Sequence, residues 1–324
     1  MIKRLTRHQL ARLGYLAVAA IAATMMVRTL REAGAPFLTA ASSIPAWALA
    51  TAFGLALVYR VINATGWSLA LRILGHPTDV VSTARLWLAS EACRWLPGSV
   101  WAYGSRTLLA TQRGLKAQAV GASLGLELIT TVAAWLVVML IGGRCFWQRL
   151  LPNGLEGLNA WAILSLILAL AAAAAAAFRL SPRLRRSIAS KWGQLASLLR
   201  CSFDPRWLAA TFLFFVAMAV FNGLALFILV QALPDRDCPL SAVIAANAAA
   251  WLAGFFALFA PGGLVVREAC LAALLATWLG PELALALALA WRLVQILAEI
   301  CCFVVVVVWG LPTNIGVVST PAAA

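Results

Sequence analysis

The sequence predicts an all-α polytopic membrane protein, and three observations support this fold class. Hydrophobic residues make up 64% of the chain and charged residues only 11%, whereas ordinary soluble domains have about 25% charged residues. Apolar runs of about 18 residues or more recur along the chain, and each can cross about 30 Å of hydrocarbon as a helix. The sequence shows none of the short alternating strands that are typical of a transmembrane barrel.

These runs predict about six full spans and two broken-helix hairpins within a single membrane domain, residues 1–324. The expected spans cover, in order, residues 13–27, 36–59 (continuing as a helix toward 74), 117–141, 160–178, 207–233 and 283–310. Each hairpin is an apolar stretch interrupted by Pro-Gly, at residues 82–110 and 240–279, because proline kinks a helix and glycine permits positive φ. Residues 312–324 are uncharged and are expected to form a disordered tail.

Charge predicts the orientation of the spans. The N-terminus (Lys3, Arg4, Arg7) and the amphipathic segment 179–200 are basic, so we expect both on the cytoplasmic side. That segment would lie on the membrane surface, either to contact anionic lipids or as a simple positive-inside bias. We also expect Arg60 to lie inside, after the second span.

This orientation makes the first hairpin enter from the cytoplasm and the second from outside. Three crossings per half then give two inverted halves, residues 1–156 and 157–311, the plan of many transporters. The arms of the second hairpin are about 20 residues long, so two full spans are an alternative there.

Composition also argues against other classes. The net charge of +14 is not gathered in one stripe, which disfavours nucleic-acid binding. Seven cysteines without a CxxC pair and only two histidines, His8 and His76, indicate no metal site. We therefore expect no cofactor. Cys145 and Cys238 would share the outer side and could form a disulfide.

The two breaks are the candidate site. They read "EACRWLPGSVWAYGSR" (91–106) and "APGGLVVRE" (260–268), and each places Pro-Gly beside arginine and glutamate. A helix that restarts at membrane depth points free N–H groups and a partial positive charge into the interior, which favours an anion such as phosphate. The break residues that we expect at this site are Pro97, Gly98, Pro261, Gly262 and Gly263.

Eight ionisable side chains lie at apparent membrane depth: Arg94, Arg106, Arg267, Arg292, Glu91, Glu127, Glu268 and Glu299. Each costs about 2.5–3.5 kcal/mol at a helix centre when unpaired, so most must be paired or face water. Glu91 and Arg94 share a helical face and could pair. Gln295 continues a polar stripe in the last span, and Asn222 and Asn247 could add hydrogen bonds.

Two roles are open for these charges. The glutamates Glu91, Glu127 and Glu299 could form structural salt bridges, or balance the charge of a bound ligand. The arginines favour a ligand role, because cations beside positive helix ends repel one another without an anion. Trp95 and Trp101 are minor candidates, since membrane tryptophans more often form interfacial belts.

The second break resembles the lysylphosphatidylglycerol synthase transmembrane-region family of bacterial integral membrane proteins. That family typically reads Pro-Gly-Gly-Leu-Gly-Val-Arg-Glu, followed some 20 residues later by an arginine in the last span. The positions that match are Pro261, Gly262, Gly263, Leu264, Val266, Arg267, Glu268 and Arg292. Val265 departs from the pattern, because the family usually has glycine there. Arg94, Pro97, Gly98 and Arg106 fit the first half more loosely.

The resemblance implies a stand-alone member of this family, without the synthase domain, in the bacterial inner membrane with a cytoplasmic N-terminus. We expect a non-enzymatic, flippase-like transporter of an anionic lipid or lipid-linked glycan, with membrane lipids as partners. An accessory protein of a lipid or glycan pathway and an intramembrane lipid-phosphate transferase are the alternatives. A homo-oligomer or an association with pathway enzymes is open. No nucleotide-binding loop is present in the sequence, so direct ATP drive is not expected.

Overall fold

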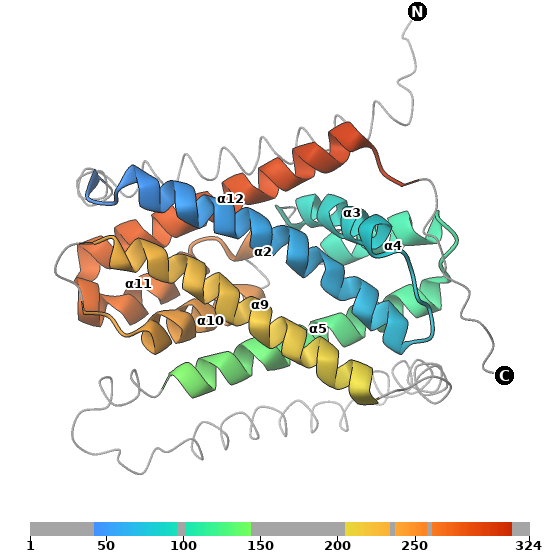
Figure 1. Cartoon of the computed structure of the whole chain (residues 1–324), viewed down its shortest axis with the longest axis horizontal. Helices are drawn as coiled ribbons and strands as arrows, with labels where there is room; N and C mark the ends of the chain where they lie inside the picture. Colours follow the sequence, from blue (N-terminus) through green and yellow to red (C-terminus); the bar gives the residue numbers. More distant parts are fainter. Residues whose placement is uncertain (1–41, 96–100, 144–204, 234–236, 258–260, 313–324) are drawn as a thin grey trace, which may run out of the picture.

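The computed structural model describes residues 42–95, 101–143, 205–233, 237–257 and 261–312 (Figure 1). The elements in these ranges are all helices, as the sequence predicts. Four helices are long and apolar enough to cross a membrane: α2 (Ala46–Ile73), α5 (Ala117–Gly142), α9 (Pro205–Gln231) and α12 (Pro281–Trp309). With 26–29 residues each, they extend over roughly 39–44 Å, which exceeds the hydrocarbon thickness.

Two interrupted hairpins complete the described part. The first consists of α3 (Val80–Glu91), the 3₁₀ turn η1 (Ala92–Trp95) and α4 (Trp101–Thr111). The second consists of α10 (Leu240–Phe256), the 3₁₀ turn η2 (Pro261–Gly263) and α11 (Val266–Leu279). The four α-helical arms have 11–17 residues, or roughly 17–26 Å, so each is shorter than a full span. These lengths favour hairpins over pairs of full spans.

The hairpins lie at opposite ends of the bundle. In Figure 1 α3 and α4 lie at the right-hand end, and α10 and α11 lie at the left-hand end. Their tips contact each other, because η1 packs on η2. The two halves of the sequence therefore meet through their interruptions.

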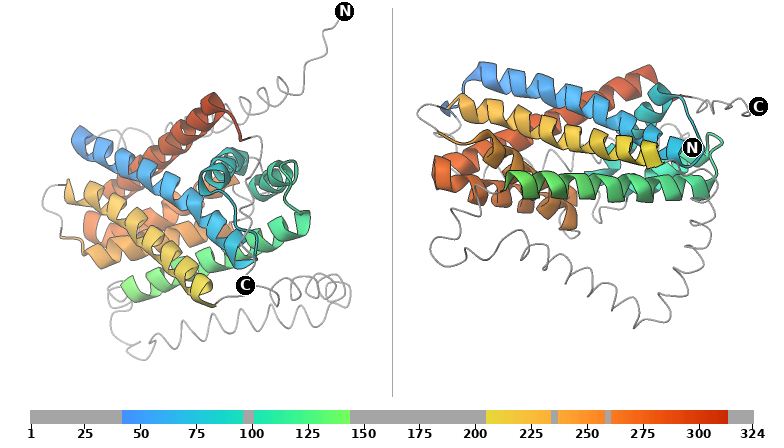
Figure 2. Two further views of the ribbon diagram at one scale, coloured as in Figure 1. Left: turned by 45° about the vertical axis from the view of Figure 1, so that its right-hand side comes forward. Right: turned by 60° about the horizontal axis from the view of Figure 1, so that its bottom comes forward.

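Small residues let the long helices pack closely. A side chain on Gly66 of α2 would collide with Phe215 of α9, since a Cβ there would lie 2.8 Å from its ring. Gly223 brings α9 equally close to Ile244 of α10. This close approach of helix backbones is typical of membrane bundles, in which packing rather than hydrophobicity drives helix association. Figure 2 shows α2 and α9 side by side in two further views.

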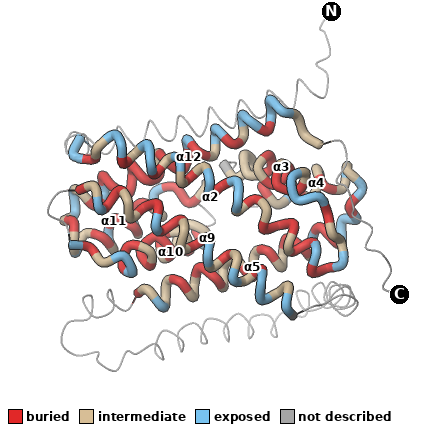
Figure 3. Tube along the Cα trace, viewed as in Figure 1, coloured by how far each residue is buried: buried red, intermediate tan, exposed pale blue. Residues whose placement is uncertain are grey.

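Burial decreases from the centre of the helix bundle to its outer surface. Buried positions face the centre and exposed positions form the outer surface (Figure 3). The larger apolar core joins α2, α9, α10, α11 and α12, and a second core joins α2, α3 and α5 around Trp67 and Trp87. Glycine and proline mark the sharp turn into the last helix, because Gly280 has a φ of 79° and Pro281 begins α12.

The two ends of the bundle differ in charge. Arg72, Arg113, Lys116 and Arg206 lie where α2 and α4 end and α5 and α9 begin, which is the right-hand end in Figure 1. At the opposite end the described residues carry Asp237 and Glu282. The positive-inside rule thus predicts that the end with α3 and α4 faces the cytoplasm.

Several predicted features lie outside the described residues. They are the spans 13–27 and 160–178, the amphipathic segment 179–200, all but the first residue of the tail 312–324, and Cys145, Pro97 and Gly98. The division into inverted halves at residue 156 likewise stays a prediction. Cys238, expected in an outer loop, is buried in the larger core.

Candidate functional site

Both breaks line one cavity with a volume of about 140 Å³. From the first hairpin it receives Glu91, Arg94 and Arg106, and from the second Gly262, Gly263 and Arg267. Glu127 of α5, Asn222 of α9 and Gln295 of α12 complete the predicted residues in its lining. The residues that the sequence singles out at two distant segments therefore come together in space.

Arg106 is the best-enclosed charge at the site. Its side chain is 1% exposed, and it donates through Nη1 to Glu127 Oε2 (2.6 Å) and through Nη2 to Glu91 Oε1 (2.9 Å). Its Nε donates to Ser90 Oγ (3.0 Å). The guanidinium also lies 5.1 Å from the ring centre of Trp87, whose Nε1 donates to the other oxygen of Glu127 (2.7 Å). These contacts join α3, α4 and α5 through one arginine.

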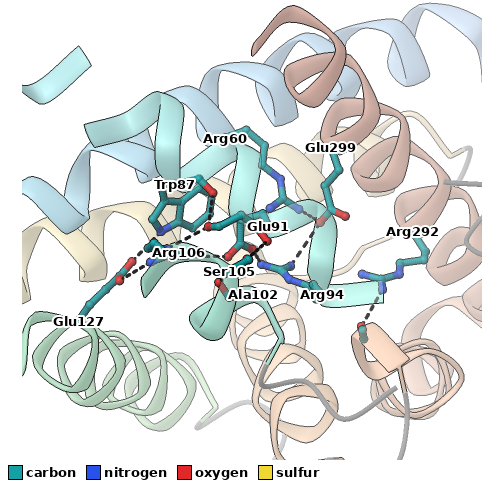
Figure 4. A network of polar contacts seen from close by, with 12 residues as sticks. Arg60, Trp87, Glu91, Arg94, Ala102, Ser105, Arg106, Glu127, Arg292 and Glu299 are labelled. Atoms are coloured by element: carbon teal, nitrogen blue, oxygen red, sulfur yellow. Dashed lines mark hydrogen bonds and ion pairs between the residues drawn. The ribbon is translucent and has the colours of Figure 1, made fainter. Parts of the chain in front are cut away.

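Arg94 of η1 connects this group to the last helix. It pairs with Glu91, as the three-residue spacing predicts, and its Nη1 lies 3.3 Å from Glu299 Oε1 of α12. Glu299 also pairs with Arg60 of α2. Figure 4 shows the resulting chain of alternating charges across the tip of the first hairpin. Glu91, Glu127 and Glu299 thus all form ion pairs with arginines.

Arg292 of α12 supports the second break. Its Nε lies 3.0 Å from Glu268 Oε1, and both side chains are about 95% buried. Its Nη2 donates to the carbonyl oxygen of Gly262 at 2.7 Å (Figure 4). The last helix therefore holds the interrupted backbone of η2 through one arginine.

The backbone of the second break needs its glycines. Gly262 and Gly263 have φ of 60° and 70°, a region that residues with a side chain rarely adopt. A Cβ on Gly263 would also lie 2.7–2.9 Å from the backbone of Gly254 in α10. Val265 follows with φ 69° and ψ −49°, so it occupies a strained conformation that glycine would adopt freely.

Arg267 differs from the other arginines at the site. It lines the cavity, yet within the described residues it makes no ion pair or hydrogen bond. Four arginines of the site (Arg60, Arg94, Arg106, Arg292) pair with four glutamates (Glu91, Glu127, Glu268, Glu299). Arg267 is a fifth arginine, so the ionised site carries one positive charge in excess.

Buried amides border this charged region. Asn247 donates through Nδ2 to Asn222 Oδ1 at 2.9 Å and accepts from Trp291 Nε1 at 3.1 Å. Gln295, one turn from Arg292 in the predicted polar stripe, lies 3.4 Å from the same Asn222 oxygen. The hydrogen bonds predicted for both asparagines are confirmed.

Sequence reasoning missed part of the site. Arg60 was expected at the cytoplasmic end of the second span, but it lies buried near the middle of α2 and lines the cavity. The expectation fails because α2 runs unbroken for 28 residues and Glu299 compensates the charge inside it. Asn63 lines the cavity one turn further on. The spacing Arg60–Asn63–Trp67 on one helical face was the available signal.

The remaining candidates differ in their placement. Pro261 lies in η2, whereas Pro97 and Gly98 are outside the described residues. Trp101 is 53% exposed and does not line the cavity. No group of three His, Cys, Asp or Glu side chains that could hold a metal ion occurs in the described part of the chain.

The arrangement suits binding of an anion. Arginine side chains from four elements line the cavity, and α11, which begins just after Gly263 of the lining, has no side-chain cap at its N-terminus. Tyr59, Trp251 and Phe255 supply an apolar wall. Each glutamate of the site is already engaged by an arginine, which leaves the excess positive charge to a ligand.

Comparison with known protein families places this geometry in context. The family model described as "Lysylphosphatidylglycerol synthase TM region" matches residues 13–302, most of the chain and both hairpins. A comparison with curated proteins finds no match.

Proposed function

Because the chain belongs to the lysylphosphatidylglycerol synthase TM-region family, we propose that it is a flippase-like transporter of an anionic lipid or lipid-linked glycan. The family points to a multi-pass membrane protein associated with lipid or glycan handling. The observation that carries the finer proposal is the cavity at which both interrupted hairpins meet.

The position of the cavity fits a transport site. Arg60 lines it and lies at the middle of the 28-residue helix α2, about half-way along the bundle. Transporters commonly bind substrate near the bilayer midplane, between discontinuous helices. Interrupted backbone at this depth is tolerated where it is buried in protein or lines a polar cavity.

The size of the cavity fits a headgroup rather than a whole lipid. Its volume of about 140 Å³ is close to that of cavities, about 150 Å³, that hold a benzene-sized molecule. Two acyl chains would not fit. The lipid would therefore place its headgroup in the cavity and leave its chains in the surrounding hydrocarbon.

The charge of the site supports an anionic headgroup. An uncompensated arginine at membrane depth is costly, and a bound anion removes that cost. The uncapped first turn of α11 adds unpaired N–H groups and a partial positive charge beside Gly262 and Gly263. Phosphate oxygens accept hydrogen bonds from both kinds of donor.

The two hairpins provide the means to open the site alternately to each side. One enters from the end with Lys116 and the other from the end with Glu282, and their tips meet at the cavity. Movement of either hairpin away from the other would connect the cavity to one aqueous side. In this proposal the chain lies in the inner membrane with its N-terminus in the cytoplasm and catalyses no reaction.

A cavity-filling variant tests the proposal. Purified protein is reconstituted in liposomes, and transbilayer movement of a fluorescent anionic phospholipid is followed by quenching of the outer leaflet. Thr131 of α5 lines the cavity, so Thr131→Trp should slow movement at least tenfold. Ile129 lies on the same helix but is 66% exposed on its outer side, so Ile129→Trp should leave the rate unchanged.

The same assay separates the alternatives. Equal loss of movement in both variants would contradict a transport role for the cavity. Chemical conversion of the lipid without transbilayer movement would favour an intramembrane transferase. Protein that is folded and monodisperse but neither moves nor converts lipid would favour an accessory role in a lipid or glycan pathway.

A further inference from the structure

We infer that the cavity selects a headgroup with a single negative charge, a phosphodiester monoanion, and that Arg267 is the residue that pairs with it. This inference rests on the proposed function for the origin of the ligand in a lipid. It adds the charge class of the ligand and the residue that determines it.

The arginines and glutamates that pair with one another around the cavity are balanced in charge. Arg106 is shared by Glu91 and Glu127, and the carboxylates lie 2.9 and 2.6 Å from it. Arg292 lies 3.0 Å from Glu268, and both are about 95% buried. Arg60, Arg94 and Glu299 complete this set, which then has four arginines and four glutamates and no net charge to offer a ligand.

Arg267 adds one positive charge to this balanced set. Arg267 is the lining arginine that forms no ion pair or hydrogen bond within the described part of the chain, although its sequence neighbour Glu268 interacts with it electrostatically. One negative charge in the cavity neutralises it. A dianion leaves a net negative charge in a low-dielectric interior, and a zwitterion or a cation leaves the excess positive charge uncompensated, so all three are disfavoured.

The backbone around Arg267 is tightly packed at the edge of the cavity. Its Cβ packs against Gly254 so closely that a Cβ on that glycine would lie only 3.1 Å away. Gly254 itself lines the cavity, as do Gly262 and Gly263. Arg267 lines the cavity together with these glycines, and a guanidinium has two parallel N–H groups that match two phosphate oxygens.

The volume of the cavity limits the size of the ligand. About 140 Å³ accommodates one phosphodiester with a compact substituent, but not the two phosphates of a cardiolipin headgroup. Charge and size therefore select the same class of ligand.

Direct binding to the full chain in detergent tests the inference. The probes are phosphatidylglycerol (one phosphate, one negative charge), cardiolipin (two phosphates), phosphatidylcholine (zwitterion) and glycerophosphoglycerol, the soluble diester without acyl chains. We expect phosphatidylglycerol to bind at least tenfold more tightly than cardiolipin or phosphatidylcholine. Arg267→Gln should abolish this preference and lower the affinity for phosphatidylglycerol at least tenfold, because one charge-assisted contact is lost.

Two further variants control for folding and total charge. Arg267→Lys keeps the charge and should retain the preference for the monoanion with weaker affinity, since lysine lacks the bidentate fork. Arg206→Gln removes one positive charge at the exposed start of α9 and should bind as the wild type does. An Arg267→Gln protein that binds phosphatidylglycerol as tightly as Arg206→Gln would overturn the inference, as would equal affinity of the wild type for all three lipids.

Its failure is distinguishable from failure of the proposed function. Lipid movement in liposomes without charge preference would contradict the monoanion rule and leave transport intact. Glycerophosphoglycerol binding as tightly as phosphatidylglycerol would support the charge rule and contradict a lipid as its source.

Discussion

Val265 takes the place of a glycine in the motif of the second break, and its backbone conformation is strained. Its φ of 69° is a conformation that β-branched residues almost never adopt, and the related motif usually has glycine at this position. Its side chain is 62% exposed, so little packing is lost by removing it. The strain lies directly between η2 and α11, beside the cavity.

We therefore expect Val265→Gly to stabilise the protein by about 1 kcal/mol. Relief of a strained backbone is worth about 1–3 kcal/mol, and the added freedom of glycine in the unfolded chain offsets part of it. Thermal unfolding in detergent measures the change. Val266→Gly, one residue later at the start of α11, should not stabilise. A lower melting temperature for Val265→Gly would show that the strain is not there.

Arg106 combines two roles that sequence reasoning treated as alternatives. It lines the cavity as predicted, and it is also the buried partner of two carboxylates. Whether it contacts a ligand stays a prediction. Its structural role leads to a separate expectation, because an arginine removed from two buried glutamates leaves their charges uncompensated.

Arg106→Met should destabilise the protein by about 3–5 kcal/mol, measured by reversible denaturation in mixed micelles. The additional substitution Glu127→Gln removes one of the uncompensated buried charges and should restore part of the loss. A double variant that is less stable than Arg106→Met alone would contradict this account of the network.

At the scale of elements, the first hairpin begins with a well-defined cap. Asp79 precedes α3 and accepts a hydrogen bond from the backbone N–H of Ser82 at 2.7 Å. This backbone hydrogen bond, with one from the Ser82 side chain, holds the pKa of the exposed Asp79 carboxyl below its ordinary value. Its charged form is favoured in the folded protein, so the cap contributes stability above the unfolded pKa and loses it as pH falls through the folded pKa.

Asp79→Ala should therefore cost about 0.5–1 kcal/mol at neutral pH, and this cost should decrease as pH falls below about 4, the unfolded pKa, toward the lower folded pKa. Asp79→Asn keeps a neutral cap, so its stability relative to Asp79→Ala should not depend on pH. Denaturation at several pH values measures both. A constant cost of Asp79→Ala from pH 7 to pH 3 would contradict a charged cap.

The sequence predicted most elements within a few residues, because proline, glycine and charge interrupt the apolar runs visibly. The break expected in residues 240–279 is observed as α10, η2 and α11. The exception is Arg60 of α2, which was expected just beyond the end of the second membrane span. A single sequence does not show that Glu299, more than 200 residues away, neutralises it. Such ion pairs depend on which helices become neighbours. Hydrophobic periodicity does not predict which helices pack against each other.

At the scale of the whole molecule, the two ends of the bundle predict the orientation. Cys238, which would have been a natural label for the outer side, is 2% exposed. Introduced cysteines at exposed positions serve better. In a cysteine-free background, Asp237→Cys and Glu282→Cys should react with an impermeant thiol reagent on intact cells, and Lys116→Cys only after permeabilisation. The opposite pattern would invert the proposed topology.

The meeting of the two breaks was predictable only as a hypothesis. Similar Pro-Gly motifs with adjacent charges suggested a shared site, but their spacing of some 160 residues fixes no distance between them. The structure supplies the contact of η1 with η2 and the ion pairs that brace it. That Arg267 is the lining arginine without an ion pair among the described residues follows only from the complete set of pairs.

The central claim is that an anionic headgroup occupies the cavity between the two breaks. Its most direct measurement is the reaction rate of Thr131→Cys, in a cysteine-free background, with a small neutral thiol reagent in nanodiscs. We expect the thiol to react in zwitterionic nanodiscs and to react several-fold more slowly when phosphatidylglycerol is present, because the headgroup covers it. A rate that is the same in both lipids, or no reaction in either, would contradict the claim.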